Sequence, residues 1–181
     1  MASAGGDIAA AVTALTKACN EAFDDPAAKK SCSHAVWCVL KDRIDPDFKY
    51  RQANDLVRFL NNETSKWRPV DLETAHSLAY NGVVVVGGAA ATSGSGHVIV
   101  VYPGTKIPRG GYNFVKNGKV QKVASKGLYP RALSTSIGSW PGAISDGEKT
   151  VWDPWGNDEA FKKVAFWTPQ VLSTAKVAGK S

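Results

Sequence analysis

The spacing of apolar residues changes once along this chain, at Asn81 and Gly82, and this change limits the folds open to it. Before these residues, apolar side chains recur every three or four positions, as they do on one face of an α-helix. After them come continuous β-branched runs, 83–86 and 98–102, which are typical of strands buried on both sides. Helices followed by a sheet predict an α+β fold, with N-terminal helices packed on an antiparallel sheet.

Helical spacing occurs in several separate segments of the first half. The predicted helices cover residues 7–23, a segment starting at Cys32, 50–61 and 70–80. Ser31 is a good N-cap residue, so Cys32 is expected in the first turn of its helix. Asp71 is the expected N-cap of the last of these helices.

The second half contains two weaker strand candidates, 119–124 and 132–137. Asn117 and Gly118 precede the first of them and predict a tight hairpin turn. Residues 87–96, rich in Gly, Ala and Ser, are expected to connect the two β-branched runs.

The length of 181 residues suits one compact domain, so we expect a single catalytic domain over residues 1–181. Residues 1–6 and 173–181 have no strong pattern and are expected to be loose ends.

The formal net charge of +6 favours an anionic partner. Lys and Arg are scattered, with no block of the kind that nucleic-acid-binding arms carry, so we expect no nucleic acid as partner. No apolar run is long enough to span a bilayer, which predicts no membrane partner. Residues 1–18 have neither the basic start nor the apolar stretch of a cleaved signal peptide.

Cys32 is the strongest candidate for chemistry among the three cysteines. A helix N-terminus carries partial positive charge and unpaired N–H groups, and Lys29 and Lys30 add charge nearby. We therefore expect a thiol pKa below the usual value of about 8.5, and N–H groups able to hold an oxyanion. The alternative is that Cys32 is a small core residue that happens to begin a helix.

Cys19 and Cys38 lie on either side of Cys32 in the sequence. They either form a disulfide in an oxidising compartment or are two free core thiols.

His97 is the candidate base, since it opens the run 98–102 directly after a flexible stretch with little side-chain bulk. The alternative is an edge histidine bonded to water. His34 lies two residues from Cys32, about 200° around a helix, and is expected to have a structural role or to form part of the cleft wall. His76 is expected to serve in packing. The histidines have no zinc spacing and no C-x-x-C pair occurs, so we expect neither metal nor organic cofactor.

Two segments resemble a known family. Cys32-Ser33-His34-Ala35-Val36-Trp37 resembles the C-S-G-x-V segment of the papain-like NlpC and CHAP cell-wall peptidases. The segment Gly96-His97-Val98-Ile99-Val100-Val101 resembles their G-H-V-x-x-V strand. The two motifs, together with the chain's small size, its basic charge and the expected absence of a cleaved signal peptide, resemble the amidase effectors of the type VI secretion system. The resemblance covers about residues 30–140.

The resemblance implies a papain-like fold and hydrolysis of an amide bond in peptidoglycan stem peptides or cross-links, with Cys32 as nucleophile and His97 as base. It also implies secretion without a cleaved signal peptide, action in the periplasm of a target bacterium, and a cognate immunity protein; a monomer is expected. His34 departs from the family, which has glycine there. The family takes its third catalytic residue from the strand after the histidine strand. Ser134 is our choice, and the other options are Ser136, Asn113 and Asp146.

Two other functions fit the same residues. A cell-wall-binding module of this fold without a working Cys-His pair would have an unreactive Cys32. A cysteine acyltransferase would share the pair but pass the acyl group to an amine instead of water. The sequence leaves open which peptidoglycan bond is cut.

Overall fold

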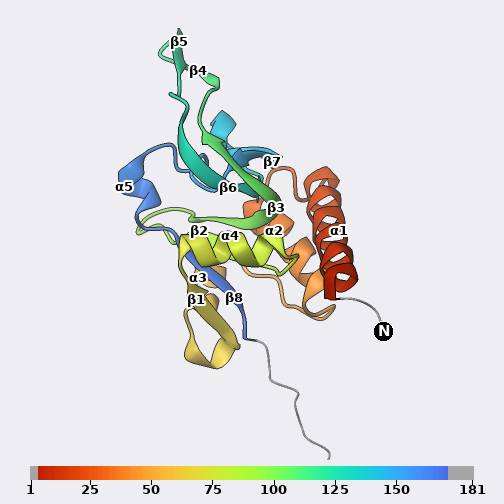
Figure 1. The fold of residues 1–181 in the computed structure, drawn as a ribbon. Helices are drawn as coiled ribbons and strands as arrows, with labels where there is room; N and C mark the ends of the chain where they lie inside the picture. The colour runs from red at the N-terminus through yellow and green to blue at the C-terminus, as the bar shows by residue number, and fades with distance from the viewer. Residues whose placement is uncertain (1–3, 171–181) are drawn as a thin grey trace, which may run out of the picture.

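The chain folds as α+β, with helices packed on an antiparallel sheet (Figure 1). The structure is a computed structural model, and it describes residues 4–170. The helices are α1 (Ala4–Asp24), α2 (Cys32–Arg43), α3 (Ala53–Leu60), α4 (Leu72–Tyr80) and α5 (Asp158–Phe161), with short 3₁₀ turns η1 (Glu63–Ser65) and η2 (Pro141–Ala143). The strands are β1 (Trp67–Val70), β2 (Val86–Ala89), β3 (His97–Arg109), β4 (Asn113–Lys116), β5 (Lys119–Lys122), β6 (Lys126–Ser134), β7 (Ser145–Thr150) and β8 (Ala165–Pro169).

The main sheet has six strands in the order β1-β8-β2-β3-β6-β7, and every neighbouring pair is antiparallel. Strand β3 lies inside this sheet, between β2 and β6. The α+β class with an antiparallel sheet, predicted from the change in apolar spacing, is therefore confirmed.

Both faces of the sheet are covered, which explains the continuous β-branched runs. Val98 and Val100 face a core that they share with α1, α2 and α3. Ile99 and Val101, which alternate with them, face a second core beside α4. A strand buried on both sides has no polar positions, so the apolar run carries no period-two pattern.

Strands β4 and β5 form a hairpin that projects from the main sheet (Figure 1). Its turn is the predicted one, because Asn117 and Gly118 both adopt positive φ angles, 52° and 71°. Such angles at both central residues belong to the two-residue turn that matches strand twist.

The predicted helices are all present, with shifted ends. Ser31 and Asp71 are the N-caps of α2 and α4, as expected. Val70 was predicted to be helical, but it is the last residue of β1, where it pairs with Phe166. The sequence pattern missed β1, β7 and β8, because short strands with mixed polar positions have no apolar period strong enough to detect.

The predicted strand and connector boundaries also need correction. Residues 83–85 precede β2, although the Val85 carbonyl already accepts from the N–H of Val101 in β3, whereas residues 87–89, expected in a connector, belong to β2. The sheet selects glycine there, since a Cβ on Gly87 would lie 2.7 Å from the Phe166 ring. The candidates 119–124 and 132–137 are strands over 119–122 and 126–134.

The N-terminal helix begins earlier than expected. Residues 4–6 were predicted as part of a loose end, but α1 includes them, since a helix already formed extends at little cost. The predicted loose end 173–181 lies outside the described residues. Within residues 4–170, no helix has both the length and the apolar content needed to cross a membrane.

Candidate active site

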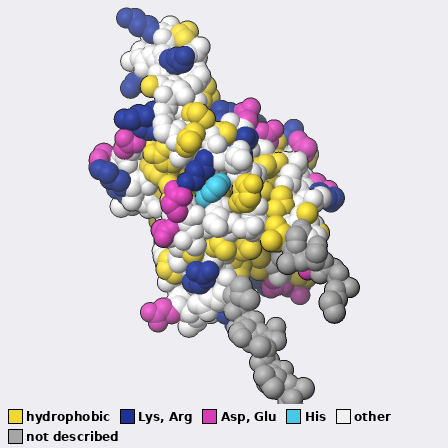
Figure 2. Space-filling view, in the orientation of Figure 1, with side chains coloured by type: hydrophobic (Ala, Val, Ile, Leu, Met, Phe, Trp, Pro, Cys, Tyr) yellow, Lys and Arg dark blue, Asp and Glu magenta, His cyan; other side chains and the backbone are white. Residues whose placement is uncertain are grey.

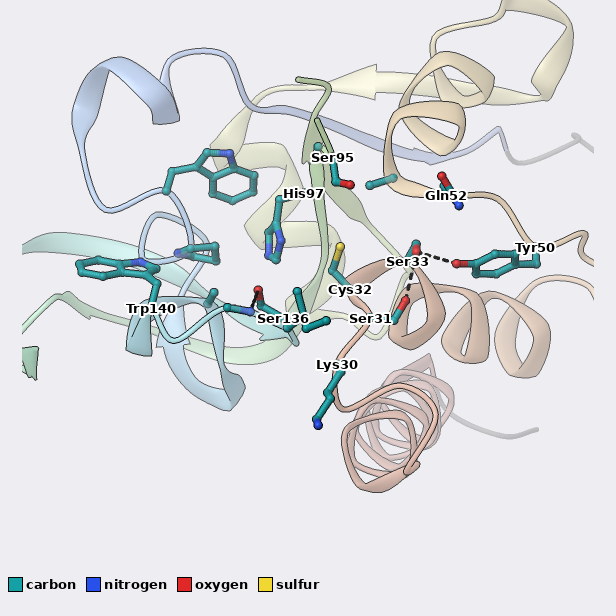
Figure 3. A pocket seen from close by; sticks show the side chains of 17 residues that line it. Lys30, Ser31, Cys32, Ser33, Tyr50, Gln52, Ser95, His97, Ser136 and Trp140 are labelled. Atoms are coloured by element: carbon teal, nitrogen blue, oxygen red, sulfur yellow. Dashed lines mark hydrogen bonds between the residues drawn. The ribbon is translucent and has the colours of Figure 1, made fainter. Parts of the chain in front are cut away.

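Cys32 is the first residue of α2, next to its N-cap (Figure 3). The Ser31 hydroxyl accepts a hydrogen bond from the backbone N–H of His34, and the Ser31 carbonyl accepts from the N–H groups of His34 and Ala35. These contacts fix the first turn. The helix packs against β3, and its first residue shares a cleft with the first residue of that strand.

His97 is the first residue of β3 and shares one cleft with Cys32. Figure 3 shows the Cys32 side chain and the His97 ring pointing toward one another across this cleft. Its volume is about 530 Å³, within the usual range of small-ligand sites. The cleft is lined by segments far apart in sequence, among them Tyr50, Gln52 and Trp140.

Ser134, at the end of β6, contacts the far side of the His97 ring. Its Oγ lies 2.9 Å from His97 Nε2 and 2.7 Å from the carbonyl oxygen of Ala143. A hydroxyl has one proton, and the carbonyl can only accept. Ser134 therefore donates to Ala143 and accepts from His97, which places the ring proton on Nε2 and leaves Nδ1 free as a base.

Burial opposes charge on both members of the pair. It lowers the pKa of His97 to about 4. Burial also raises the pKa of the Cys32 thiol, while the backbone N–H groups of Val98, Ser33 and Cys32 itself lower it by less. The predicted low thiol pKa is thus wrong for the free protein, because desolvation of the sulfur outweighs the helix N-terminus. The resting pair is a neutral thiol and a neutral imidazole.

Two of those three N–H groups, of Cys32 and Ser33, belong to the helix N-terminus that was predicted to offer them, and the third, of Val98, belongs to β3. They lie close enough to the sulfur to favour negative charge on it. The amides of Cys32 and Ser33 precede the helix's own hydrogen bonds and are free to turn to an oxyanion.

Two residues that support His97 escaped prediction. Trp155 packs edge-on against the imidazole, with 5.5 Å between ring centroids. Asn54, on α3, holds the loop before β3: its Oδ1 accepts from the N–H groups of Ala91 and Gly96, and its Nδ2 donates to the carbonyl of Gly94. Neither residue has a local pattern that marks it, because both act across long distances in sequence.

The other sequence candidates lie outside this pair. Ser136 lines the cleft, but its hydroxyl accepts from Gly138 and does not contact His97. Asn113 is on the projecting hairpin, and Asp146 on β7 borders a different pocket. His34 packs edge-on against Trp37, away from the Cys32 cleft, so it forms no part of this cleft's wall. His76 Nε2 lies 3.2 Å from the carbonyl oxygen of Gly104, a packing role as expected.

Cys19 and Cys38 are free thiols. Cys19 lies on the buried face of α1, where burial raises the pKa of its thiol. Cys38 is half-buried, and its sulfur lies 3.7 Å from a carboxylate oxygen of Asp25. The structure therefore has the two free thiols rather than a disulfide between Cys19 and Cys38.

The cleft continues past His97 into a second pocket, which shares Ser95, Gly96, His97 and Trp155 with the first. Neither pocket has an acidic residue among its described lining residues. The charged side chains are Lys30 in the first pocket and Lys163 in the second. The groove on both sides of the Cys-His pair therefore favours anionic ligands.

Searches against protein-family models and against curated proteins gave no match for this chain.

Proposed function

We propose that this protein is a cysteine amidase of papain-like fold that hydrolyses an amide bond in peptidoglycan stem peptides or cross-links. The observation that carries the proposal is the placement of Cys32, His97 and Ser134. A thiol at a helix N-terminus faces a histidine whose other nitrogen is held by a buried hydroxyl. Nucleophile, base and orienting group in a row are the arrangement used by thiol hydrolases.

In the proposed reaction, the Cys32 thiol gives its proton to Nδ1 of His97 while the sulfur attacks the scissile carbonyl. The charge that forms on the carbonyl oxygen is held by backbone N–H groups at the start of α2. His97 then passes its proton to the leaving amine, and the acyl group stays on sulfur as a thioester. Water, deprotonated by His97, releases the acid and restores the thiol.

The charge of the groove supports a peptidoglycan peptide as substrate. Stem peptides carry carboxylates on D-glutamate and on diaminopimelate, on either side of the amide bonds between them. Lys30 and Lys163 lie in the two pockets that meet at His97, and no described lining residue there would repel a carboxylate. Both the D-alanine to diaminopimelate cross-link and the D-glutamate to diaminopimelate bond fit this charge pattern.

We further propose that the protein acts as an antibacterial effector of a type VI secretion system. Its motif pair resembles that class, which implies release without a cleaved signal peptide, action in a rival cell's periplasm and a cognate immunity protein. An immunity protein that blocked the cleft would have to cover Cys32 and His97.

Digestion of purified Gram-negative sacculi tests the amidase. Wild type and Cys32→Ala are incubated with sacculi, and the released muropeptides are separated by chromatography and identified by mass spectrometry. Cys19→Ala is the matched control, since it removes a buried thiol that does not line the cleft. We expect new fragments from wild type and from Cys19→Ala but none from Cys32→Ala.

Other outcomes point to the alternatives. Binding to sacculi without release of fragments would replace the amidase with a binding module. Fragments that carry an added amine, in place of a free carboxylate, would identify an acyltransferase.

A further inference from the structure

Three side chains of the kinds that bind zinc converge beside α2, outside the Cys32 cleft. His34 and Cys38 are four residues apart on α2 and so share one face. Asp25 comes to this face from the segment that follows α1. One carboxylate oxygen, one ring nitrogen and the sulfur all lie within 4.8 Å of one another. All three residues are half-buried and line a common shallow pocket.

The spacing of these atoms suits a tetrahedral cation. The Cys38 sulfur and Oδ2 of Asp25 are 3.7 Å apart. Zinc bonds of about 2.3 Å to sulfur and about 2.1 Å to oxygen place two tetrahedral ligands about 3.6 Å apart. These two ligand atoms therefore already stand at the separation that zinc requires, and a His34 ring nitrogen lies within 4.8 Å of both.

Contacts behind two of the three ligands, Asp25 and His34, hold these side chains in place. Oδ1 of Asp25 accepts the N–H of Ala27 at 2.8 Å, so Oδ2 is the oxygen that faces Cys38. The His34 ring packs against Trp37 and Tyr50, with centroids 5.0 and 6.0 Å away. Among the described residues, no side chain or backbone group hydrogen-bonds the ring nitrogens of His34. Ligands oriented by their neighbours are typical of metal sites.

The charged side chains around the pocket favour a cation, because two carboxylates, Asp25 and Asp42, outnumber the single ammonium of Lys41. Lys41 and Asp42 also line the pocket, and Nζ of Lys41 is held over the Trp37 ring, 4.8 Å from its centroid. A cation that binds the Cys38 sulfur takes the place of its thiol proton.

We propose that Asp25, His34 and Cys38 form a zinc-binding site with water as the fourth ligand. The absence of a C-x-x-C pair argued against zinc in the sequence, but this site takes its third ligand from another segment of the chain. Bound zinc would tie the segment after α1 to the middle of α2, the helix that begins at Cys32. The proposal is independent of the peptidoglycan amidase.

Cobalt(II) is the probe, because a cobalt–thiolate bond absorbs in the near ultraviolet. The full chain is used in reduced form and with the substitution Cys32→Ala, so that the cleft thiol cannot contribute to the cobalt–thiolate band. We expect one equivalent of Co²⁺ to produce the thiolate band, and Zn²⁺ to displace it. Zinc in hundredfold excess over its dissociation constant should raise the melting midpoint by about 5–10 °C.

Variants in the Cys32→Ala background assign the ligands. Cys38→Ser should abolish the thiolate band, and His34→Ala should weaken Co²⁺ binding by at least ~10-fold. Cys19→Ala is the matched thiol control and should bind as its parent does. Circular dichroism checks that each variant is folded. If Cys38→Ser does not fold, His34→Ala still tests the site. No thiolate band in the parent, or an unchanged band in Cys38→Ser or His34→Ala, would overturn the site.

Discussion

The hydrogen bonds of one buried hydroxyl decide the state of the His97 ring. Ser134 gives its proton to the Ala143 carbonyl and can only accept from Nε2 of His97. The nitrogen that faces the cleft is then unprotonated, while burial keeps the ring neutral far below its usual pKa. At neutral pH the base is thus ready to accept a proton, and the thiol has yet to give it up.

The neutral pair predicts the acid side of the pH profile. His97 accepts the thiol proton only when neutral, and its pKa is lowered to about 4 by burial. We expect kcat/KM on a soluble muropeptide to stay level as pH falls through 6 and to drop only near pH 4. Folding must be checked at each pH. As pH falls from about 6.5 toward 4, the unfolded chain takes up a proton on His97 that the folded protein does not, so the free energy of unfolding decreases. An acid limb near 6.5 in folded protein would contradict this state.

Ser134 is predicted to act as a positioning residue through the imidazole. Ser134→Ala removes the acceptor for Nε2–H, so the other tautomer competes and the base is lost for part of the time. We expect kcat to fall ~10–100-fold with little change in KM. Ser136→Ala is the matched control, since Ser136 lines the same cleft without contacting His97, and it should keep most activity. Equal losses in both variants would remove the special role of Ser134.

At the scale of elements, the end of α4 is built to fit against α1. Gly82 follows the C-cap residue Asn81 and has a φ angle of 79°. A Cβ on it would lie 2.4 Å from the backbone carbon of Ala11 in α1. The glycine that ends the helical half of the sequence therefore also allows two helices to touch.

Two glycines with nearly the same φ angle separate the cost of the left-handed backbone from the cost of steric overlap with α1. Gly94 has a φ of 76°, but a Cβ there would meet nothing within 4 Å. Gly94→Ala should lower the free energy of unfolding by about 1 kcal/mol, the cost of the left-handed angle alone. Gly82→Ala adds overpacking against α1 and should cost about 3 kcal/mol or more. Urea unfolding measures both, and similar losses would mean that α1 moves aside freely.

At the scale of the whole molecule, charge is divided unevenly. No Asp or Glu occurs between Glu73 and Asp146, a stretch that includes β3 and the projecting hairpin. Figure 2 shows Lys and Arg side chains on the projecting hairpin, which is positive while the body carries both signs. Phe114, in this hairpin, packs on Trp140, which lines the Cys32 cleft. The basic arm thus extends outward from the proposed active site.

The arm should strengthen binding to anionic cell wall. Replacing Lys116, Lys119 and Lys122 with Gln should weaken binding to sacculi ~10-fold at low salt, because their charges are exposed and attract carboxylates. The difference should vanish at about 0.5 M salt. A control that replaces Lys17, Lys49 and Lys66 removes equal charge elsewhere. Pelleting with sacculi measures both, and equal losses would mean that only net charge matters.

The sequence alone determined the α+β class, the start of α2 at Cys32, and the hairpin turn at Asn117 and Gly118. Each depends on residues adjacent in the chain, because helical periods, caps and tight turns are local. It also singled out Cys32, His97 and Ser134, from their local setting and from the family resemblance, without showing that they meet.

Only the tertiary structure decided the rest. The short strands at the sheet edges, the Asn54 contacts and the convergence of Asp25 with His34 and Cys38 join segments far apart in sequence. The thiol pKa shows the same limit most clearly. The helix N-terminus, which lowers it, is visible in the sequence, whereas the burial that outweighs it exists only after α2 has packed against β3.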